Sequence, residues 1–457
     1  MFLGREKELV SLERMYSKQG FQMAVVYGRR RIGKTSLLNE FVKEKNSLYV
    51  AAEEVNDALN LEKFSRSIGQ KLGMMNFPPF TDWNKLFSFV KEQFGDKKLV
   101  FVIDEYPYAA TANPSLNSIL QHVIDYDFKE SNIFLILCGS SMSFMEDNVL
   151  GEKSPLFGRR TGQLKVNPLD YFDSSLFYPK ASDEDKIKYY SCVGGTPYYL
   201  SLIDPDSSFE DNMRELYFDI NGYLLNEGTL LMKQEFREPA IYNSILQAIA
   251  SGAKTLNEIV GFTKLQSVSV SRYLHTLQEL NYIVRVIPFG ANALKGKTSR
   301  YEISENFISF WYRYVFSVRS EIERGSGDVY ASAALEDLPN FMGYRFEEIT
   351  REYLRRVNLR KELPFIAKSF GTWWGKDSRG DLQEVDIIAP SLRGKELLVG
   401  ECKWRESFNI AQTLEVLDHR AAFFSRYTTH QYLFTKKAVE GDTAKHVTFV
   451  SLKDYFK

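Results

Sequence analysis

The feature that most constrains this chain is a short apolar segment that leads into a glycine-rich loop and then a helix. Residues 23–27 (MAVVY) have the pattern of a buried strand, and residues 28–35 (GRRRIGKT) follow the pattern G-x-x-x-x-G-K-[ST]. Gly28 and Gly33 allow backbone angles that other residues resist, so successive N–H groups can point at phosphate oxygens. The pattern predicts a loop that binds the phosphates of a nucleoside triphosphate.

Two side chains of the loop have predicted chemical tasks. Lys34 would reach the β and γ phosphates, and the Thr35 hydroxyl would ligate Mg²⁺, whose shell is completed by phosphate oxygens and water. The residues expected to contact the phosphates are Gly28, Arg29, Arg30, Arg31, Ile32, Gly33, Lys34, Thr35 and Ser36.

A second apolar segment, residues 99–103 (LVFVI), ends in Asp104 and Glu105. A continuous apolar run is typical of a strand that is buried on both faces of a parallel sheet. Ligands bind at the carboxyl ends of such strands, so Asp104 would hold the metal through its water shell and Glu105 would polarise the attacking water. A third run, residues 133–138, is followed by serines at 140–141, which either sense the γ phosphate or form a plain turn.

Composition limits the other possibilities. At 457 residues the chain exceeds the roughly 100–200 residues of a single domain, so several cores are expected. Charged residues at 5–7 stand where a secretion signal would be apolar, and no segment approaches the ~18 apolar residues of a membrane span. The three cysteines and five histidines lack the spacing of a zinc site. We therefore expect a cytoplasmic protein without a membrane partner.

The first half of the chain resembles a known family in six segments, FLGRE, GRRRIGKTSL, FVIDE, CGSS, PLFGRR and VGGTPYYL. These segments are similar to the archaeal-type P-loop ATPases of the STAND branch of the AAA-like superfamily, over roughly residues 1–230. The resemblance implies a P-loop ATPase core with a parallel sheet at residues 1–166 and a helical lid at 167–235. ATP and ADP are the implied cofactors, with Mg²⁺.

The same resemblance implies contacts outside the loop. Gly4 and Arg5 would lie near the adenine, and Pro197 would pack a helical lid on the nucleotide. Arg159 or Arg160 would meet the γ phosphate, either within the chain or from a neighbouring subunit of a homo-oligomer. The alternative for these two arginines is a solvated basic turn.

The middle of the chain is predicted to form three helices followed by a hairpin. Apolar spacing indicates a helix at 239–250, and Thr255 with Glu258 has the pattern of a capping box that begins a second helix. A third helix begins at Ser267, and strands follow at 282–287 and 299–303. This order is typical of a winged helix, which we place at residues 236–322.

In a winged helix the third helix enters the major groove of DNA. The candidate base contacts are Gln266, Ser269, Arg272 and His275, and the candidate phosphate contacts are Lys295 and Lys297. A net charge of −1 argues against broad coating of nucleic acid but leaves room for a local basic face. Because the third helix has only one arginine, the fold could serve instead as a packing or protein-contact module.

A further domain is expected at residues 332–457, after a flexible glycine-containing linker at 324–328. Alternation along the strand-like segment 397–404 (LLVGECKW) puts Glu401 and Lys403 on one side. If Asp386 lies on a neighbouring strand, the two acids could bind Mg²⁺ and the lysine could position or activate water against a phosphodiester. Glu-x-Lys is common as a surface ion pair, but here it follows an apolar strand.

This tail resembles the PD-(D/E)XK nuclease superfamily, through FGTWWGKD, EVDII and GECKW in residues 370–405. The resemblance implies a restriction-endonuclease-like α/β fold, with Asp386 and Glu401 as metal ligands and Lys403 as the catalytic lysine. Glu347 would be an auxiliary carboxylate, although Glu348 adjoins it. Mg²⁺, or Mn²⁺ in its place, would serve this site.

The sequence thus predicts a multidomain α/β protein: a Mg²⁺-dependent ATPase coupled to a nuclease that acts on nucleic acid, with DNA as the expected substrate. The alternative is a nucleotide-dependent regulatory switch or scaffold whose nuclease-like tail only binds, or is degenerate. The two hypotheses share the nucleotide site and differ in whether the C-terminal domain is catalytic.

Overall fold

The computed structural model describes residues 2–291, 299–377, 379–439 and 444–457. Contacts divide the chain into two compact units. Unit 1 contains the residues up to 168 together with 196–198, and unit 2 contains 169–195 and the residues from 199 onward.

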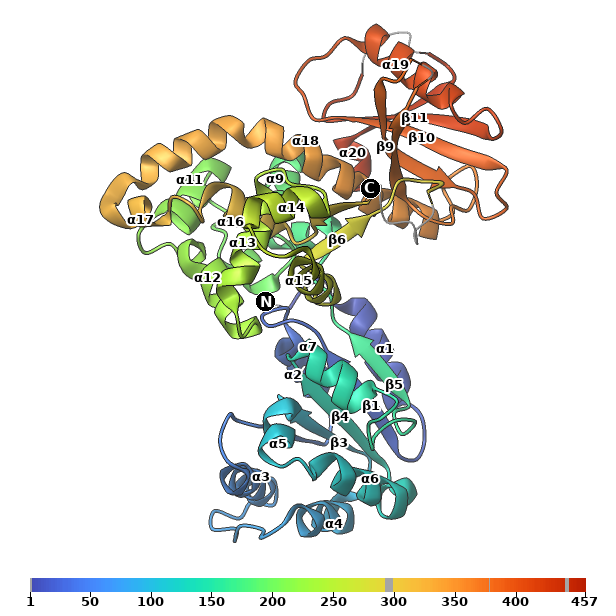
Figure 1. Ribbon diagram of the computed structural model, residues 1–457. Helices are drawn as coiled ribbons and strands as arrows, with labels where there is room; N and C mark the ends of the chain where they lie inside the picture. Colours follow the sequence, from blue (N-terminus) through green and yellow to red (C-terminus); the bar gives the residue numbers. More distant parts are fainter. Residues whose placement is uncertain (1, 292–298, 378, 440–443) are drawn as a thin grey trace. The chain divides into compact units, whose positions relative to one another are not determined.

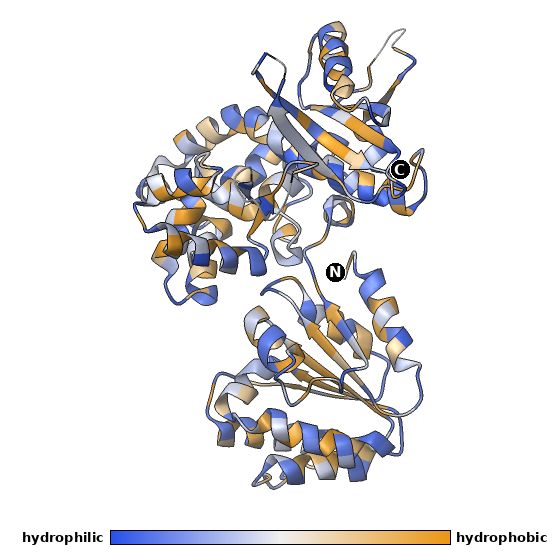
Figure 2. Cartoon of the chain, turned by 45° about the vertical axis from the view of Figure 1, so that its right-hand side comes forward, coloured by the Kyte–Doolittle hydropathy of each residue, from blue (hydrophilic) through white to orange (hydrophobic). Residues whose placement is uncertain are grey.

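Unit 1 is built on a five-stranded sheet in which every pair of neighbouring strands is parallel, in the order β2-β3-β4-β1-β5. The strands are β1 (Gln22–Tyr27), β2 (Ser47–Ala51), β3 (Leu99–Asp104), β4 (Ile133–Gly139) and β5 (Gly162–Lys165). Every residue of β1, β3 and β4 is buried, as their continuous apolar runs predict. Figure 2 shows these strands as the most hydrophobic part of the unit.

Helices cover both faces of this sheet (Figure 1). The helices are α1 (Glu6–Tyr16), α2 (Lys34–Val42), α3 (Asp57–Lys71), α4 (Trp83–Phe94), α5 (Tyr106–Ala112), α6 (Leu116–Tyr126) and α7 (Met142–Phe144). On one face, Leu12 of α1 and Phe41 of α2 share a core cluster with Val100. On the other, Phe87 of α4 packs against Phe101, whose side chain alternates to the opposite face from Val100.

Unit 2 begins with helices. These are α8 (Tyr171–Ser174), α9 (Asp183–Val193), α11 (Phe209–Met213), α12 (Tyr223–Glu235), α13 (Pro239–Ala250), α14 (Leu256–Thr263), α15 (Ser267–Glu279), α16 (Asn306–Tyr314) and α17 (Arg319–Glu321), while α10 (Pro197–Leu200) includes residues of both units. The predicted helix at 239–250 and the capping box of Thr255 with Glu258 are confirmed. Strands β6 (Ile283–Val286) and β7 (Arg300–Ile303) pair as an antiparallel hairpin. Lys295 and Lys297, the predicted phosphate contacts, lie outside the described residues.

The predicted flexible linker at residues 324–328 is wrong. This segment is helical, because a π-helical turn at Ile322–Ser326 leads directly into α18 (Gly327–Leu359), a helix of 33 residues. Gly325 has φ 97°, so this glycine makes a kink between helices instead of a flexible connection. A Cβ on Gly327 would lie 1.9 Å from the Phe218 carbonyl oxygen, so the second glycine permits close packing. The domain boundaries at 236–322 and 332–457 stay predictions.

The C-terminal part of unit 2 is a five-stranded mixed sheet in the order β12-β11-β10-β9-β8. Its strands are β8 (Gly371–Lys376), β9 (Leu382–Pro390), β10 (Glu396–Lys403), β11 (Thr428–Thr435) and β12 (Val447–Ser451). The pairs of β9 are antiparallel and those of β11 are parallel. Helix α18 packs on β9 and β10 as well as on α9, and α19 (Ile410–Ala422) packs on β9, β10 and β11, while α20 (Leu452–Tyr455) follows β12.

A membrane-spanning helix would need a long apolar stretch, and none of the helices in the described part of the chain has one. The expected cytoplasmic location stays a prediction.

Candidate functional site

The glycine-rich loop of unit 1 joins β1 to α2 at the carboxyl edge of the sheet. Gly33 adopts a left-handed conformation with φ 85°, and Arg31 has φ 66°. A Cβ on Gly28 would lie 2.3 Å from the carbonyl oxygen of Val166, so this position has no room for a side chain. These constraints hold the loop as a tight backbone turn in front of the N-terminus of α2, which is the geometry that binds phosphate.

Lys34 lies across this loop. Its Nζ donates hydrogen bonds of 2.9 Å to the carbonyl oxygens of Gly28 and Arg29, and the residue is 5% exposed. The ammonium is therefore held inside the loop, within reach of the backbone that the sequence assigns to the phosphates. Ser36 follows in the first turn of α2, one residue beyond Thr35.

The Asp104 carboxylate, at the end of β3, accepts three hydrogen bonds. Thr35 Oγ1 donates to Asp104 Oδ2 at 2.9 Å, the Tyr49 hydroxyl donates to the same oxygen at 2.6 Å, and the Glu105 backbone N–H donates to Oδ1 at 2.9 Å. The structure thus brings the two predicted metal-site residues, Thr35 and Asp104, together. Tyr49 on the neighbouring strand β2 was not predicted from the sequence. Burial, followed by the charge of Asp104, raises the pKa of the Tyr49 hydroxyl, which keeps it a hydrogen-bond donor.

Glu105 begins the next segment in a left-handed conformation, with φ 48°. Its Oε2 accepts hydrogen bonds from the Ser140 backbone N–H at 3.2 Å and from Ser140 Oγ at 2.9 Å. A non-glycine residue with this φ is uncommon and is held by its surroundings. The arrangement fixes the Glu105 carboxylate beside the serine that follows β4.

The residues assigned by resemblance also lie at this loop. Arg5 is 4% exposed, and its Nη2 donates to the Ile32 carbonyl oxygen at 2.9 Å, while Nη1 pairs with Glu8. Gly4, which precedes it, has φ 69°. Pro197 Cγ would lie 3.7 Å from a Cβ placed on Gly33.

The arginines of the loop and of the 155–160 segment have different surroundings. Arg30 Nη2 donates to the Tyr108 hydroxyl at 3.0 Å. Arg159 is held by both oxygens of Asp125, at 3.0 and 2.6 Å. Burial and then Glu146 raise the pKa of Tyr27, whereas Arg160 lowers it, so the charge of Arg160 acts on the residue that precedes the loop. Arg160 Nη1 donates to the Leu150 carbonyl oxygen at 3.3 Å, so of the two candidates Arg159 is the one held by an ion pair.

A second group of polar side chains lies in unit 2, on β9 and β10. The register pairs Val399 with Ile388 and Gly400 with Ile387, so Asp386 and Glu401 come next on both strands. Asp386 Oδ2 accepts a 2.9 Å hydrogen bond from the Cys402 backbone N–H. Burial, and then the charge of Glu401, raise the pKa of Asp386 to about 7.

The helix α18 contributes Glu347 to this group. Burial, and then the charge of Asp386, raise the pKa of Glu347 well above its usual range. The adjacent Glu348 instead pairs with Arg351, whose Nη1 also donates to the Asp386 carbonyl oxygen at 3.0 Å. Of the two neighbouring glutamates, Glu347 is therefore the one that shares the electrostatic surroundings of Asp386.

Two cations face Glu401, which is 4% exposed. Lys403 Nζ donates to Glu401 Oε1 at 2.6 Å, as the alternation along the strand predicts. Arg420 of α19 pairs with Glu401 Oε2. The sequence did not predict Arg420, because it lies 19 residues after Glu401 and belongs to no motif. We call Glu347, Asp386, Glu401, Lys403 and Arg420 the acidic cluster. In the described part of the chain, no three His, Cys, Asp or Glu side chains form a group that could hold a metal ion.

Comparisons with known proteins find two families, one that matches the N-terminal part of the chain and one that matches a later part. A family described as an ATPase domain predominantly from Archaea matches residues 2–203, and a family of archaeal and bacterial proteins of unknown function matches residues 311–415. The Methanocaldococcus jannaschii protein MJECL04 is 36% identical over 406 residues, which cover 89% of this chain and 88% of that protein.

One solved structure is similar in fold to this chain, and a second one matches more weakly. The Walker-type ATPase PABY2304 of Pyrococcus abyssi matches with a TM-score of 0.52 at 19% identity, over 68% of this chain and 96% of its own. The Aeropyrum pernix ORC2 protein matches more weakly, with a TM-score of 0.42 at 14% identity, over 70% of this chain and 94% of its own. The chain therefore belongs to the same family as MJECL04, and it carries an archaeal-type P-loop ATPase domain followed by a region whose family has no known function.

Proposed function

We propose that unit 1 hydrolyses ATP with Mg²⁺. The observation that carries this proposal is the convergence of Lys34, Thr35, Asp104 and Glu105 at one edge of the parallel sheet. The Thr35 hydroxyl and the Asp104 carboxylate are oxygen ligands of the type that Mg²⁺ prefers, directly or through water. Bound there, Mg²⁺ would neutralise charge on the β and γ phosphates.

The side chains of this site divide the remaining work. Lys34 would exchange its two carbonyl acceptors for phosphate oxygens, and Glu105 would orient the attacking water from the position that Ser140 fixes. Gly4, Arg5 and Pro197 would border the nucleotide, and Arg160, rather than Arg159, would meet the γ phosphate.

Replacing the loop lysine tests this assignment. Lys34→Ala should abolish ATP turnover, whereas Lys43→Ala, which removes a 69% exposed lysine just after the same helix, should leave turnover unchanged. Equal turnover in wild type and Lys34→Ala would overturn the proposal.

For unit 2 we propose a metal-dependent nuclease centre whose cutting of nucleic acid, with DNA as the expected substrate, is coupled to the ATP cycle. Its support is the proximity of Glu347, Asp386, Glu401 and Lys403, which lie on two strands and one helix. Glu401 is buried and Asp386 is half-buried, and a cation beside them would offset the charge that the pKa of Asp386 shows to be disfavoured. Mg²⁺ often binds through one or two carboxylates and keeps several waters, so Asp386 and Glu401 would suffice as protein ligands.

In this centre the metal would supply Lewis-acid stabilisation of the phosphodiester and activation of a bound water. Asp386 and Glu401 would hold it, and Glu347 would accept a hydrogen bond from its water shell. Lys403 would turn from Glu401 to a phosphate oxygen or to the attacking water. Arg420 would hold the second oxygen of Glu401 and so orient that carboxylate.

The three helices and hairpin that precede α16 support a winged-helix assignment, with α15 as the DNA-facing helix. Gln266, Arg272 and His275 are exposed and Ser269 is half-exposed, so these predicted contacts lie on an accessible face of α15. The guanidinium of Arg272 also donates to the Tyr273 hydroxyl at 2.9 Å. With a single cation described on this face, we propose weak, salt-sensitive DNA binding.

Cleavage assays separate the two centres. Lys403→Ala should abolish Mg²⁺- or Mn²⁺-dependent cleavage and leave ATP turnover intact, while Lys395→Ala, just before the same strand, should cleave normally. Wild-type protein that cuts neither DNA nor RNA with either metal, with or without ATP, would refute the nuclease proposal.

One observation favours a second function. Glu401 is paired with both Lys403 and Arg420, an arrangement that also serves as a neutralised structural cluster. In that case ATP binding would switch partner binding or oligomerisation, and the tail would not be catalytic. A nucleotide-dependent change of mass in light scattering, without cleavage, would support the switch.

A further inference from the structure

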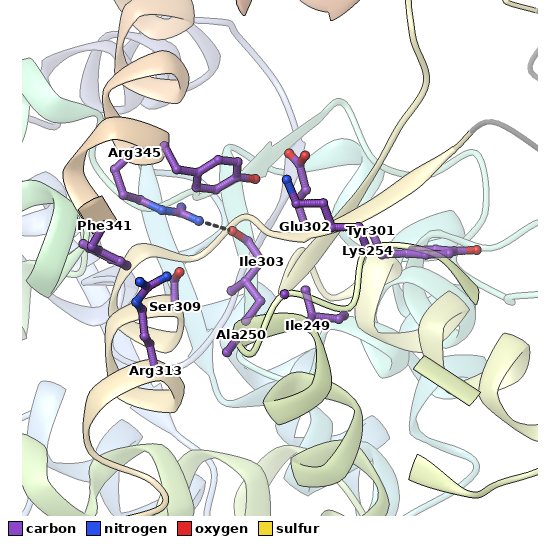
Figure 3. A pocket seen from close by; sticks show the side chains of 12 residues that line it. Ile249, Ala250, Lys254, Tyr301, Glu302, Ile303, Ser309, Arg313, Phe341 and Arg345 are labelled. Carbon is purple, nitrogen blue, oxygen red and sulfur yellow. Dashed lines mark hydrogen bonds between the residues drawn. The ribbon is translucent and has the colours of Figure 1, made fainter. Parts of the chain in front are cut away.

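A cavity of about 200 Å³ lies within unit 2, between α13, β7, α16 and α18 (Figure 3). A water molecule occupies roughly 30 Å³ in the liquid, so the cavity has room for a small organic molecule. None of the residues that line it belongs to the nucleotide loop or to the acidic cluster.

Arg345 of α18 provides the strongest chemical signal in this cavity. It is 1% exposed, its Nη1 donates to Asn306 Oδ1 at 2.8 Å, and its Nη2 donates to the Ile303 carbonyl oxygen at 2.8 Å. Both partners are neutral, and Nε is buried without an acceptor in the part of the chain that the structure describes. The charge of Glu348 on the same helix acts on Arg345, but no hydrogen bond to a carboxylate is described for this guanidinium. A buried donor without an acceptor is costly, and an anion that accepts from Nε would offset this cost.

The other lining residues show what kind of anion fits. Figure 3 shows Arg313 and Ser309 on the same side of the cavity as Arg345, with Phe341 next to them. Arg313 Nε and Nη2 donate to Asp337 Oδ2 at 3.2 and 2.7 Å, so Asp337 offsets its charge, and Arg313 would contribute N–H donors rather than an isolated positive charge. Apolar side chains, including Phe341 and Ile249, form much of the rest of the wall. Lys254 and the buried Glu302 also line the cavity, away from Arg313, so an anion is expected at the arginine end only.

We propose that this cavity binds a small organic anion, whose carboxylate or phosphate group accepts hydrogen bonds at the Arg345 end and whose apolar body packs against Phe341 and Ile249. A charged hydrogen bond to a guanidinium supplies the affinity, because donor and acceptor are both ionised and desolvated. The apolar wall selects molecules that carry a ring or a short chain over a bare inorganic anion. The site is independent of the function proposed for either centre.

The test measures binding of benzoate and of phenyl phosphate to the full chain by calorimetry, with saturating ADP and Mg²⁺ present so that the nucleotide loop is occupied. Benzamide is the neutral probe of matched shape, and inorganic phosphate is the probe without an apolar body. Ala250→Phe fills the cavity from its wall and leaves the hydrogen bonds of Arg345 in place. Arg313→Gln weakens the cationic end, and Arg319→Gln, outside the cavity, is its matched control.

We expect saturable binding of benzoate or phenyl phosphate, which Arg313→Gln weakens by about tenfold or more and Arg319→Gln leaves unchanged. Ala250→Phe should abolish it, with circular dichroism confirming that each variant folds. Which of the two anions binds more tightly identifies the head group as carboxylate or phosphate. Absence of binding, equal binding of benzamide, tighter binding of inorganic phosphate, or binding that persists in a folded Ala250→Phe protein would overturn the proposal.

Discussion

Replacing Asp386 with asparagine should stabilise unit 2 at alkaline pH. The pKa of this carboxyl rises from 3.8 to about 7 on folding, chiefly because it is buried and secondly because Glu401 is nearby. At about 1.4 kcal/mol per pKa unit, the folded protein disfavours the carboxylate by about 4 kcal/mol. A raised pKa contributes stability that is fully present below about pH 4 and is lost as the pH rises through about 7.

The asparagine is neutral at every pH, and its oxygen can still accept from the Cys402 backbone N–H. Without metal, the gain in free energy of unfolding of Asp386→Asn over wild type should therefore be about 4 kcal/mol larger at pH 8 than at pH 4. Because four of the five tryptophans lie in unit 2, at positions 311, 373, 374 and 404, tryptophan fluorescence in a urea titration reports mainly on this unit.

The exposed Asp381→Asn is the control for loss of a carboxylate outside the acidic cluster. Mn²⁺ should stabilise wild type at pH 8 and have no such effect on Asp386→Asn, since the variant lacks one of the proposed ligands. If Asp386→Asn destabilises the protein equally at pH 4 and pH 8, the carboxylate is not penalised by its surroundings and the reasoning about the acidic cluster is wrong.

Three further substitutions probe other parts of the chain. Tyr49→Phe removes a donor that orients Asp104, so Mg²⁺ affinity in the ADP complex should fall by about tenfold while ADP binding in EDTA is unchanged, as calorimetry can show. Gly28→Ala brings a Cβ within 2.3 Å of the Val166 carbonyl oxygen, and nucleotide binding should be lost in a fluorescent-ADP titration. Burial, and then Asp170, raise the pKa of Glu352 to about 7, so Glu352→Gln should stabilise the protein above pH 7 and have little effect below pH 4 in urea titrations.

The parts of the fold that the sequence predicted correctly are those with local patterns. The glycine loop, the apolar strand before Asp104 and the capping box at Thr255 each lie within a few residues, where backbone geometry and side-chain spacing decide the structure. Tyr49 and Arg420 were missed because they reach their carboxylates only through strand order and helix packing, at separations of 55 and 19 residues.

The prediction of a flexible linker at residues 324–328 failed for a different reason. Glycine serves in flexible segments, at helix kinks and at close contacts, and the local sequence does not distinguish these uses. Here Gly327 packs closely against the Phe218 backbone and begins the 33-residue helix α18, so this glycine lies in a helix rather than in a linker. The predicted roles of the site residues stay predictions, because a role depends on ligands as well as on positions.

The pairing of Glu401 with two cations leads to a prediction that distinguishes a metal site from a structural cluster. If a metal uses Glu401, it competes with Arg420 for Oε2 and with Lys403 for Oε1. Arg420→Gln removes one competitor, so Mn²⁺ affinity without nucleotide should rise several-fold, while cleavage should fall because the carboxylate loses its orienting partner. Arg426→Gln, four residues after the end of α19, is the control for charge. Should Arg420→Gln instead unfold unit 2 without any gain in Mn²⁺ affinity, Glu401 is a structural ion-pair partner and the switch becomes the better account of this protein.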